Sequence, residues 1–495
     1  MNNVYLSKSK YCRAKQCNKI LWMDKHKPEF ATQTAADVVL ENGTKVGELA
    51  RSILGDYINI DFNDNLSIMV ENTANCLKNT PNIITEASFN FNNNFCSVDI
   101  LKNDTDGIEI YEVKSSTEIK DIYLDDIAYQ VYIVTSLGYK VKSANIVYIN
   151  NNYVRYGKLE LDKLFIIENV TDIVFEKQQE IRDKIEEIND YMMLEEQDER
   201  LGIQCFEPYA CQYWEYCTKN LPEKNIFSIK RMNKNKKIEL YNKGIYKYED
   251  LVNQDLGWRY KQQIEIDLYD KEPIIKKDEI RDFMKTLSFP LYFLDFETFQ
   301  QAIPEYDGIK PYQQIPFQYS LHYIESENGE IKHKEYLAEP GEDPRRKLAE
   351  RLVKDIPTDA CVLAYNMGFE KGRIKELAET YPDLAESLIK IRNNIKDLMI
   401  PFINREYYTK EMEGSYSIKY VLPALFPNEP ELDYHNLPVV HNGGEASSAF
   451  ATLQEKTKEE QKIIREGLLE YCKLDTLAMV KVWEKLKEII KKDSN

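Results

Sequence analysis

Strand-like and helix-like stretches alternate in two separate blocks of this sequence, and a charged helical segment divides the blocks. In the first block, apolar alternation marks neighbouring strands at 97–103 and 108–116, which a helix at 125–139 and a strand at 143–149 follow. Residues 175–200, rich in Glu, Lys and Ile, then have the pattern of an amphipathic helix. This order predicts an α/β fold for the first block.

The second block begins near residue 286 with a similar alternation. Adjacent strands are expected at 291–299 and 317–325, and a later strand at 360–368. Residues 459–490 are expected to form a long but interrupted helix. The second block is therefore also predicted to be α/β.

Three regions are predicted from this organisation. Residues 1–222 form the first α/β domain, 223–285 a helical linker, and 286–495 the second α/β domain. Within the linker, residues 236–251 have the pattern helix, turn at Gly244, helix. That pattern resembles a helix-hairpin-helix element, which offers backbone N–H groups to a phosphate, and an ordinary helical linker is the alternative.

The balance of charge limits how the chain could meet a nucleic acid. A formal net charge of −18 argues against a surface coated uniformly with basic residues. Two local basic runs remain, at 8–19 and 230–237, and solvated helical faces or loops are the simpler interpretation of both. No run of 18 apolar residues and no secretory signal are present, so a cytoplasmic location without a membrane partner is expected.

The stretch FLDFET, residues 293–298, places two acids in an otherwise apolar strand. Asp295 and Glu297 share a face of that strand, because alternate residues point the same way. Two neighbouring carboxylates repel each other and are costly to bury, so a buried strand tolerates them only with a counter-charge. A divalent cation would provide it.

Two further acids and a tyrosine lie in the second block. Glu370 occurs in AYNMGFEKGRI, and Asp475 occurs in EYCKLDTLAMV four residues after Tyr471, so the tyrosine and Asp475 share a helical face. If both acids converge on the FLDFET strand, four carboxylates could hold two Mg²⁺ or Mn²⁺ ions. That arrangement suits phosphodiester hydrolysis.

The succession LDFET, YNMGFE and YCKLD resembles the DnaQ-like 3′–5′ exonucleases, which have an RNase H-like core. The resemblance implies that Asp295, Glu297 and Asp475 bind metal. Glu370 stands where that family usually has Asp and would support the second ion. Tyr471 would orient or deprotonate the attacking water.

Other residues near these motifs have structural interpretations. Asn366 and Phe369 are expected to shape the site, and Asp397 is interpreted as a surface acid or a helix cap. The glycines of HNGGEASS, near residue 441, are interpreted as a turn beside the core.

The first block carries a second carboxylate pattern. Asp99 ends the strand-like SVD, and Glu112 and Lys114 follow on one face of the next strand. The two acids could ligate one divalent metal, while Lys114 positions a water or neutralises charge in the transition state. Because an E-x-K tripeptide arises easily in so charged a chain, an exposed strand with an ion pair is the alternative.

Together with the apolar strands around it and Gln130 on the following helix, this pattern resembles the RecB-family branch of the PD-(D/E)xK nucleases, which have a restriction-endonuclease-like core. The resemblance implies that the two acids bind metal, that the lysine is catalytic and that Gln130 approaches the active site. The earlier helix acid or histidine of the family is assigned to Glu48, with Glu86 as the second choice.

Three cysteines, Cys205, Cys211 and Cys217, follow one another at equal spacing. Clustered thiolates suit iron–sulfur or zinc, and Cys12 and Cys17 near the N-terminus could supply a fourth ligand.

Cys17, in QCNKILW, resembles the first cysteine of RecB-family nucleases, CRISPR-associated members included, that hold a [4Fe–4S] cluster with one cysteine before the core and three after it. The resemblance implies a structural cluster on Cys17, Cys205, Cys211 and Cys217, with Zn²⁺ as the alternative. The C-x-x-C pair usual in that family is replaced here by C-x5-C.

Nearly the whole chain resembles a bacterial fusion of a RecB-like nuclease, carrying the cysteine cluster, with a DnaQ-like exonuclease. The resemblance implies a metal-dependent nuclease that acts on DNA in repair, recombination or defence, with single strands or duplex ends as partners. A helicase or a defence complex is a compatible further partner. RNA is the main rival substrate, and a catalytically inactive nucleic-acid-binding scaffold is the alternative from another class, although the intact acid sets argue against it.

Overall fold

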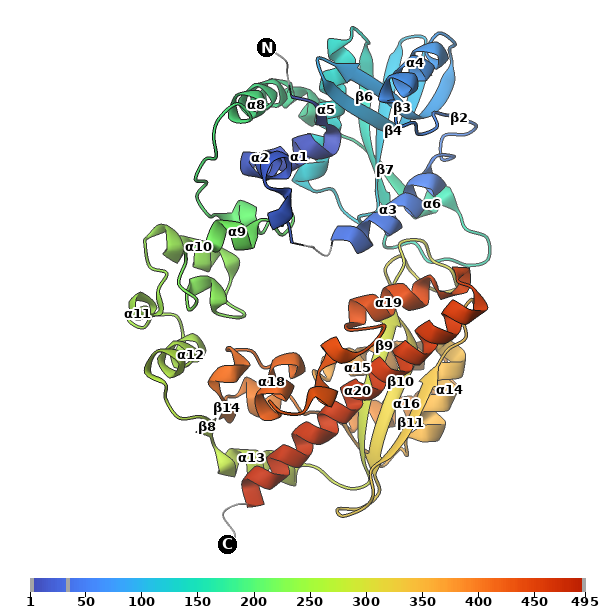
Figure 1. Ribbon diagram of the computed structural model, residues 1–495. Helices are drawn as coiled ribbons and strands as arrows, with labels where there is room; N and C mark the ends of the chain where they lie inside the picture. Colours follow the sequence, from blue (N-terminus) through green and yellow to red (C-terminus); the bar gives the residue numbers. More distant parts are fainter. Residues whose placement is uncertain (1–3, 33–35, 492–495) are drawn as a thin grey trace. The chain divides into compact units, whose positions relative to one another are not determined.

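The computed structural model describes residues 4–32 and 36–491, and the chain divides into two compact units (Figure 1). Unit 1 comprises Met1–Leu221 with Gln301–Tyr312, and unit 2 comprises Pro222–Gln300 with Gln313–Asn495. Both units combine a sheet with helices, which confirms the predicted α/β class. Residues 223–285, which the sequence separates as a linker, group with unit 2.

Unit 1 is built on a mixed sheet. In the described residues its strands follow the order β2-β3-β4-β5-β6-β7, and β1 pairs with β4. Strands β3, β4 and β5 are successively antiparallel, β6 is parallel to β5, and β7 is antiparallel to β6. The strands are β1 (Leu6–Ser7), β2 (Ile58–Asn59), β3 (Asn82–Phe91), β4 (Asn94–Asp104), β5 (Gly107–Lys114), β6 (Val141–Ile149) and β7 (Phe165–Asn169). The predicted strands of the first block are confirmed as β4, β5 and β6.

Helices cover both faces of this sheet. Ile110 belongs to the core beneath α5, whereas its neighbour Tyr111 belongs to a second core with residues of α3, because alternate side chains of β5 point to opposite faces. The helices of unit 1 are α1 (Lys8–Gln16), α2 (Asn18–His26), η1 (Pro28–Phe30), α3 (Ala36–Ala50), α4 (Leu66–Cys76), α5 (Asp121–Ser136), α6 (Leu161–Leu164), α7 (Thr171–Glu176), α8 (Gln178–Tyr191), η2 (Ile203–Cys205) and α9 (Trp214–Thr218).

The helix predicted over 175–200 is shorter than expected. The structure has two helices there, α7 and α8, and α8 ends at Tyr191. The residues that follow include Glu195, Glu196, Asp198 and Glu199. Negative side chains are unfavourable at the C-terminal end of a helix, where the helix dipole is also negative, so the acidic stretch does not extend α8.

The segment Gln301–Tyr312 leaves the second block and packs within unit 1. The backbone N–H of Arg155 donates to the carbonyl of Ile309 at 3.1 Å, and the N–H of Gly308 donates back to the carbonyl of Arg155 at 2.7 Å. Gly308 has a φ of +73°, which a residue without a Cβ adopts at little cost. The chain therefore contributes a short piece of the second block to the first unit.

Unit 2 contains a five-stranded sheet in the order β11-β10-β9-β12-β13. Strands β9, β10 and β11 are antiparallel neighbours, and β12 and β13 run parallel to β9. The strands are β9 (Leu291–Phe299), β10 (Ile315–Ile324), β11 (Lys332–Leu337), β12 (Cys361–Ala364) and β13 (Ile395–Asp397), and a separate pair is formed by β8 (Ile274–Ile275) and β14 (Tyr407–Tyr408). The predicted adjacency of 291–299 and 317–325 is confirmed.

The two faces of this sheet have different helical covers. Leu294 and Phe296 pack in a core with residues of α14, α15 and α16. Phe293 and Phe299 face the other way, where their rings meet Trp483 of α20 and Phe450 of α19, and Figure 1 shows α20 crossing β9 and β10.

The helices of unit 2 are η3 (Ile226–Ser228), α10 (Lys234–Asn242), α11 (Tyr248–Leu251), α12 (Trp258–Tyr269), α13 (Lys277–Lys285), α14 (Arg345–Asp355), α15 (Gly368–Thr380), α16 (Ala385–Asn393), α17 (Ile400–Ile403), η4 (Lys410–Met412), α18 (Ile418–Leu425), η5 (Pro430–Leu432), η6 (Tyr434–Asn436), α19 (Gly443–Ala451), η7 (Leu453–Glu455) and α20 (Lys458–Lys491). Helices α10 and α11 flank Gly244, which has a φ of +77°, as the helix-turn-helix pattern predicts. No helix in the described ranges is long and apolar enough to span a membrane.

Two expectations for the C-terminal part are wrong. The helix predicted to be interrupted is the continuous α20, and Gly467 does not break it. A Cβ at Gly467 would lie 2.6 Å from the Cβ of Val439, so the glycine permits a close approach. The glycines of HNGGEASS do not form a turn but begin α19, where Asn442 Oδ1 accepts a hydrogen bond from the N–H of Glu445 at 3.0 Å.

Candidate functional site

Strand β9 presents Asp295 and Glu297 on the face that α19 and α20 cover, because its alternate residues Leu294 and Phe296 pack in the opposite core. Glu297 is 7% exposed, and Asp295 is half-buried. Ligand atoms of both acids and of Cys472, in α20, all lie within 4.8 Å of one another. The Sγ of Cys472 lies 3.9 Å from Asp295 Oδ2.

Glu370 and Asp475 bring two further carboxylates to this face. Glu370 lies in the first turn of α15 and is 3% exposed, and its Oε2 has no hydrogen-bond partner among the described residues. Asp475 is half-buried in α20, where its Oδ1 accepts a hydrogen bond from the hydroxyl of Tyr434 at 2.8 Å. The four acids predicted from LDFET, YNMGFE and YCKLD are thus brought together within unit 2.

Burial raises the pKa of all four carboxyl groups, and repulsion by the neighbouring acids adds to the shift at Asp295 and Glu297. Burial, followed by the charges of the other three acids, raises the pKa of Asp295 well above its usual value. Burial and then Asp475 raise the pKa of Glu297 in the same way. Burial also raises the pKa of Glu370 to about 8 and that of Asp475 to about 6. Lys419, in α18, opposes these shifts at Glu297 and Asp475, but one exposed lysine does not balance four acids.

Tyr471 is buried in α20 beside the acids. Burial, then the charge of Asp475, raises the pKa of Tyr471 above its usual value. A Cβ added at Gly443 would lie 3.6 Å from Glu297 Oε2 and 4.0 Å from the Tyr471 hydroxyl. The first turn of α19 therefore lies against the space between Glu297 and Tyr471. Only a small residue at position 443 leaves that space open.

Of the two interpretations of Asp397, a surface acid or a helix cap, the structure contradicts the surface acid. It is 8% exposed, and its carboxylate accepts backbone hydrogen bonds from Asn366 at 3.0 Å, Met367 at 3.2 Å and Met399 at 2.9 Å. These bonds cap the turn that precedes α15. They hold Asn366 at a φ of +71°, a conformation that costs free energy for a residue other than glycine.

A pocket of about 490 Å³ opens beside Asp295 and Asp475, and Arg231, Asn366 and Tyr416 also line it. The guanidinium carbon of Arg231 lies 3.7 Å from the centroid of the Tyr416 ring, and Arg231 has a φ of +61°. Among the described residues, Arg231 has no carboxylate partner. An unpaired hydrogen-bond donor therefore borders the acids at a point where the backbone is strained.

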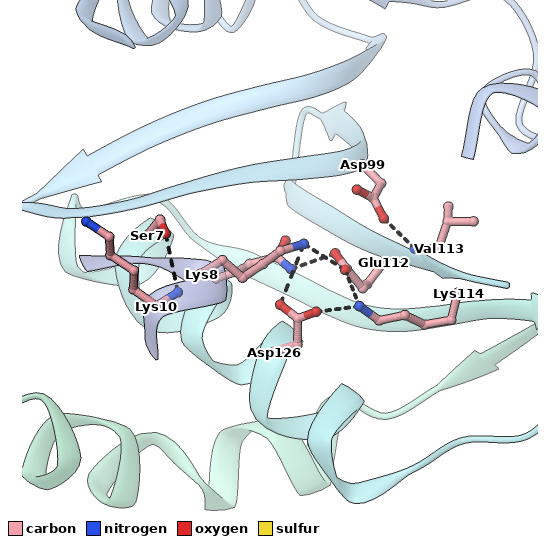
Figure 2. Close-up of polar contacts among 9 residues, drawn as sticks. Ser7, Lys8, Lys10, Asp99, Glu112, Val113, Lys114 and Asp126 are labelled. Atoms are coloured by element: carbon pink, nitrogen blue, oxygen red, sulfur yellow. Dashed lines mark hydrogen bonds and ion pairs between the residues drawn. The ribbon is translucent and has the colours of Figure 1, made fainter. Parts of the chain in front are cut away.

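In unit 1, strands β4 and β5 hold a second acidic site. The N–H of Val113 donates to Asp99 Oδ2 at 2.7 Å. Glu112 is 1% exposed; Lys114 Nζ lies 2.7 Å from its Oε1, and Gln130 Nε2 donates to its Oε2 at 2.6 Å. The structure thus groups the residues that the E-x-K pattern singled out (Figure 2).

Two residues that the sequence analysis did not assign complete this cluster. Lys8, the first residue of α1, has its Nζ 2.7 Å from Glu112 Oε1 and 3.6 Å from Asp126 Oδ1. Asp126, in α5, also pairs with Lys114. Figure 2 shows the side chains of Lys8, Glu112, Lys114 and Asp126 converging. A signal for Asp126 was present, because it precedes Gln130 by four residues and shares its helical face.

The charges of this cluster are more evenly balanced than those of unit 2. Burial, then the charge of Glu112, raises the pKa of Asp99 to about 7. Although burial opposes it, Lys114 and Lys8 lower the pKa of Glu112 below its usual value. Although burial opposes that shift as well, the three surrounding acids raise the pKa of Lys8 well above its usual value.

The two candidates for the additional helix acid lie on different elements, α3 and β3. Glu48 is exposed on α3 and makes no hydrogen bond or ion pair with Asp99 or Glu112 among the described residues. Glu86, the second choice, lies in β3 with a φ of +57°, and Arg51 Nη2 lies 3.1 Å from its Oε1.

Four cysteines line one small cavity of about 20 Å³: Cys17, Cys205, Cys211 and Cys217. The N–H of Cys211 donates to the carbonyl of Cys205 at 3.0 Å, and burial raises the pKa of Cys17 and Cys217 to about 11. No three of the four sulfur atoms all lie within 4.8 Å of one another. Cys12 does not line this cavity.

Comparison with known proteins finds one matching domain model and one distant relative. Residues 292–417 match the model of a domain of unknown function, DUF2779. The matched stretch includes all but the first residue of β9 and the whole of α15, and it stops before Tyr471 and Asp475. An uncharacterised protein of Ureaplasma parvum serovar 3 is 25% identical over 265 residues, which is 49% of this chain and 38% of that protein. The chain thus covers well under half of that relative's length. No solved structure matches the chain at a significant level.

Proposed function

We propose that this protein is a metal-dependent nuclease that hydrolyses DNA at two sites, with 3′–5′ exonuclease action in unit 2 and RecB-like nuclease action in unit 1, in repair, recombination or defence. The observation that carries the proposal is the meeting of Asp295, Glu297, Glu370 and Asp475 around one face of β9 with too little positive charge to balance them. The surrounding α/β sheet is compatible with an RNase H-like core.

Bound divalent cations account for an otherwise costly cluster. Four carboxylates that repel one another destabilise a fold unless a counter-ion is present. Glu370 Oε2 has no hydrogen-bond partner among the described residues, so it is available as a metal ligand. Oxygen ligands of this kind suit Mg²⁺ or Mn²⁺. When bound, such ions activate a water and stabilise the attacking and leaving oxygens of an in-line displacement.

The side chains of unit 2 have separate roles in this proposal. Tyr434 holds Asp475 through its hydroxyl, so the carboxylate keeps one orientation. Tyr471 lies one helical turn before Asp475 and orients the attacking water. Arg231 offers its unpaired guanidinium to a phosphate of the bound strand, and Asn366 lines the same pocket.

In unit 1, we infer that Asp99 and Glu112 ligate a single divalent ion. Gln130 holds Glu112 through Oε2, which fixes the orientation of that ligand. Lys114, which shares a face of β5 with Glu112, stabilises the charge that develops on the phosphate.

The four cysteines are proposed to hold a [4Fe–4S] cluster of structural role, with Zn²⁺ as the alternative. The four thiols that line one cavity suit either group, because both bind clustered thiolates. Anaerobically purified protein should be brown and contain about four irons per chain, whereas a colourless, zinc-loaded protein would decide for the alternative.

A cleavage assay tests the proposal. The full chain with Mn²⁺ should degrade end-labelled single-stranded or duplex DNA, and RNA should be offered in parallel. Asp295→Ala and Lys114→Ala should abolish separate activities, whereas Asp359→Ala and Lys102→Ala, exposed or partly exposed residues of the same units, should not. Lack of cleavage of any substrate by the wild type would favour a binding scaffold, and preference for RNA would change the substrate.

A further inference from the structure

The ammonium group of Lys8 lies among the carboxylates of the unit 1 site. Its Nζ contacts Glu112 Oε1 at 2.7 Å and Asp126 Oδ1 at 3.6 Å, and the charge of Asp99 also acts on it. Figure 2 shows Lys8 reaching into the cluster from α1, whereas Lys10 of the same helix points away. Lys8 therefore contacts Glu112, one of the two acids to which the metal is assigned.

The backbone that carries Lys8 is held in place. Leu6, in β1, pairs with Asn94 of β4, and the Oγ of Ser7 caps α1 by accepting a hydrogen bond from the N–H of Lys10 at 3.3 Å. The ring of Tyr11 stacks on a tyrosine of α5 with 4.6 Å between the centroids. The start of α1 is thus anchored to the sheet and to α5, which limits where the ammonium group can lie.

Glu112 already has a positive partner on its own strand. Lys114 Nζ lies 2.7 Å from the same Oε1 that Lys8 contacts, and it pairs with Asp126 as well. Lys8 is therefore a second ammonium on one carboxylate oxygen. A divalent ion that binds Glu112 has to displace at least one of these two ammonium groups. Because Lys8 belongs to α1 and its ammonium group ends a flexible four-carbon side chain, that group can move away without disturbing β5.

We propose that Lys8 is a tethered cation that competes with the divalent ion for Glu112, and that it thereby sets the metal affinity of the unit 1 site. This inference rests on the proposed function, since it takes Glu112 as a metal ligand. Like charges a few ångströms apart repel one another strongly in a partly buried site. Removal of the Lys8 charge should therefore tighten metal binding by at least about tenfold.

The experiment measures Mn²⁺ binding by the full chain. All proteins carry Asp295→Asn and Asp475→Asn, so that the ligands proposed in unit 2 are removed and unit 1 dominates the titration. Lys8→Met keeps the length and the apolar stem of the side chain without its charge. Lys10→Met is the matched control, because it removes the same charge from the same helix at an exposed position.

Free Mn²⁺ is followed by electron paramagnetic resonance, and folding is checked by thermal unfolding. Lys8→Met should bind Mn²⁺ at least about tenfold more tightly than the parent, whereas Lys10→Met should match the parent. Lys8→Gln should behave like Lys8→Met and serves if the methionine variant does not fold, and Lys8→Arg, which keeps the charge, should retain weak binding.

Each other result counts against the inference. Equal or weaker binding by the folded neutral variants, or an equal gain in Lys10→Met, overturns it and leaves the proposed metal site intact. No Mn²⁺ binding by any of these proteins overturns the inference together with the unit 1 metal site.

Discussion

Replacement of Glu370 by Gln removes a charge from the acid cluster of unit 2 and should stabilise the metal-free protein. Burial raises the pKa of Glu370 to about 8 from 4.5, which corresponds to roughly 5 kcal/mol against the charged form in the fold. The side-chain amide of the variant buries an N–H without a partner, which costs about 1–3 kcal/mol of this gain. The expected net gain in the free energy of unfolding at high pH is therefore about 2–4 kcal/mol.

The pH dependence of this gain has a definite sign. The pKa of Glu370 in the fold lies above that of the unfolded chain, so between about 4.5 and 8 the folded carboxyl keeps a proton that the unfolded one loses. The free energy of unfolding of the metal-free wild type should therefore fall as pH rises through this interval. The advantage of Glu370→Gln should grow over the same interval and level off above about pH 8.

Urea unfolding in EDTA at pH 6 and pH 9 measures the effect, with Glu379→Gln, an exposed acid of the same helix, as the control. Addition of Mn²⁺ should then favour the wild type, because a ligand at one hundred times its Kd stabilises a protein by about 2.7 kcal/mol, and Glu370→Gln should gain less. The reasoning is refuted if the variant shows no larger advantage at pH 9 than at pH 6, or if Mn²⁺ stabilises both proteins equally.

Three further outcomes are expected. Gly443→Leu should fill the space between the strand carboxylate and the tyrosine and lower DNA cleavage by about 100-fold without unfolding the protein, as measured by turnover and circular dichroism. Arg231→Gln should weaken single-stranded DNA binding about tenfold and lower the salt slope of the affinity by about 0.7, as followed by fluorescence anisotropy. Lys236→Gln, in the same basic run but outside the pocket, should leave that slope unchanged. Cys217→Ser should remove the bound metal and lower the unfolding temperature by about 5 °C or more, whereas Cys76→Ser should do neither.

Local patterns in the sequence predict which site residues share a face of β9 or of α20, but they leave open whether Glu370 and Asp475 converge on the strand. The alternation of β9 put Asp295 and Glu297 on one face, and four-residue spacing put Tyr471 and Asp475 on one side of α20. The signal for α19 was also local, because Asn442 and Glu445 have the spacing of a helix start, but the two glycines between them suggested a turn.

Residues supplied by distant elements could not be found in this way. Lys8 meets Glu112 across 104 residues, and Tyr434, in the single turn η6, meets Asp475 across 41. The pattern of the basic run at the N-terminus indicates a solvated helical face or a loop. In the structure Lys19 is 6% exposed, and its Nζ lies 3.2 Å from Glu196 Oε1. The hydrophobic periodicity of the sequence does not predict this ion pair.

Helix α1 joins two centres of different chemistry. Lys8 begins it, Cys17 follows its last residue, and near that end the side chain of Gln16 donates to the carbonyls of Gln204 at 2.7 Å and Tyr209 at 2.8 Å. Nine helical residues make a strut roughly 13 Å long, which shortens only by breaking hydrogen bonds. Oxidation of the thiols, or removal of the metal that they are proposed to bind, would therefore displace the Lys8 ammonium group among the carboxylates. The oxidation state of the cysteines should be controlled in any metal titration.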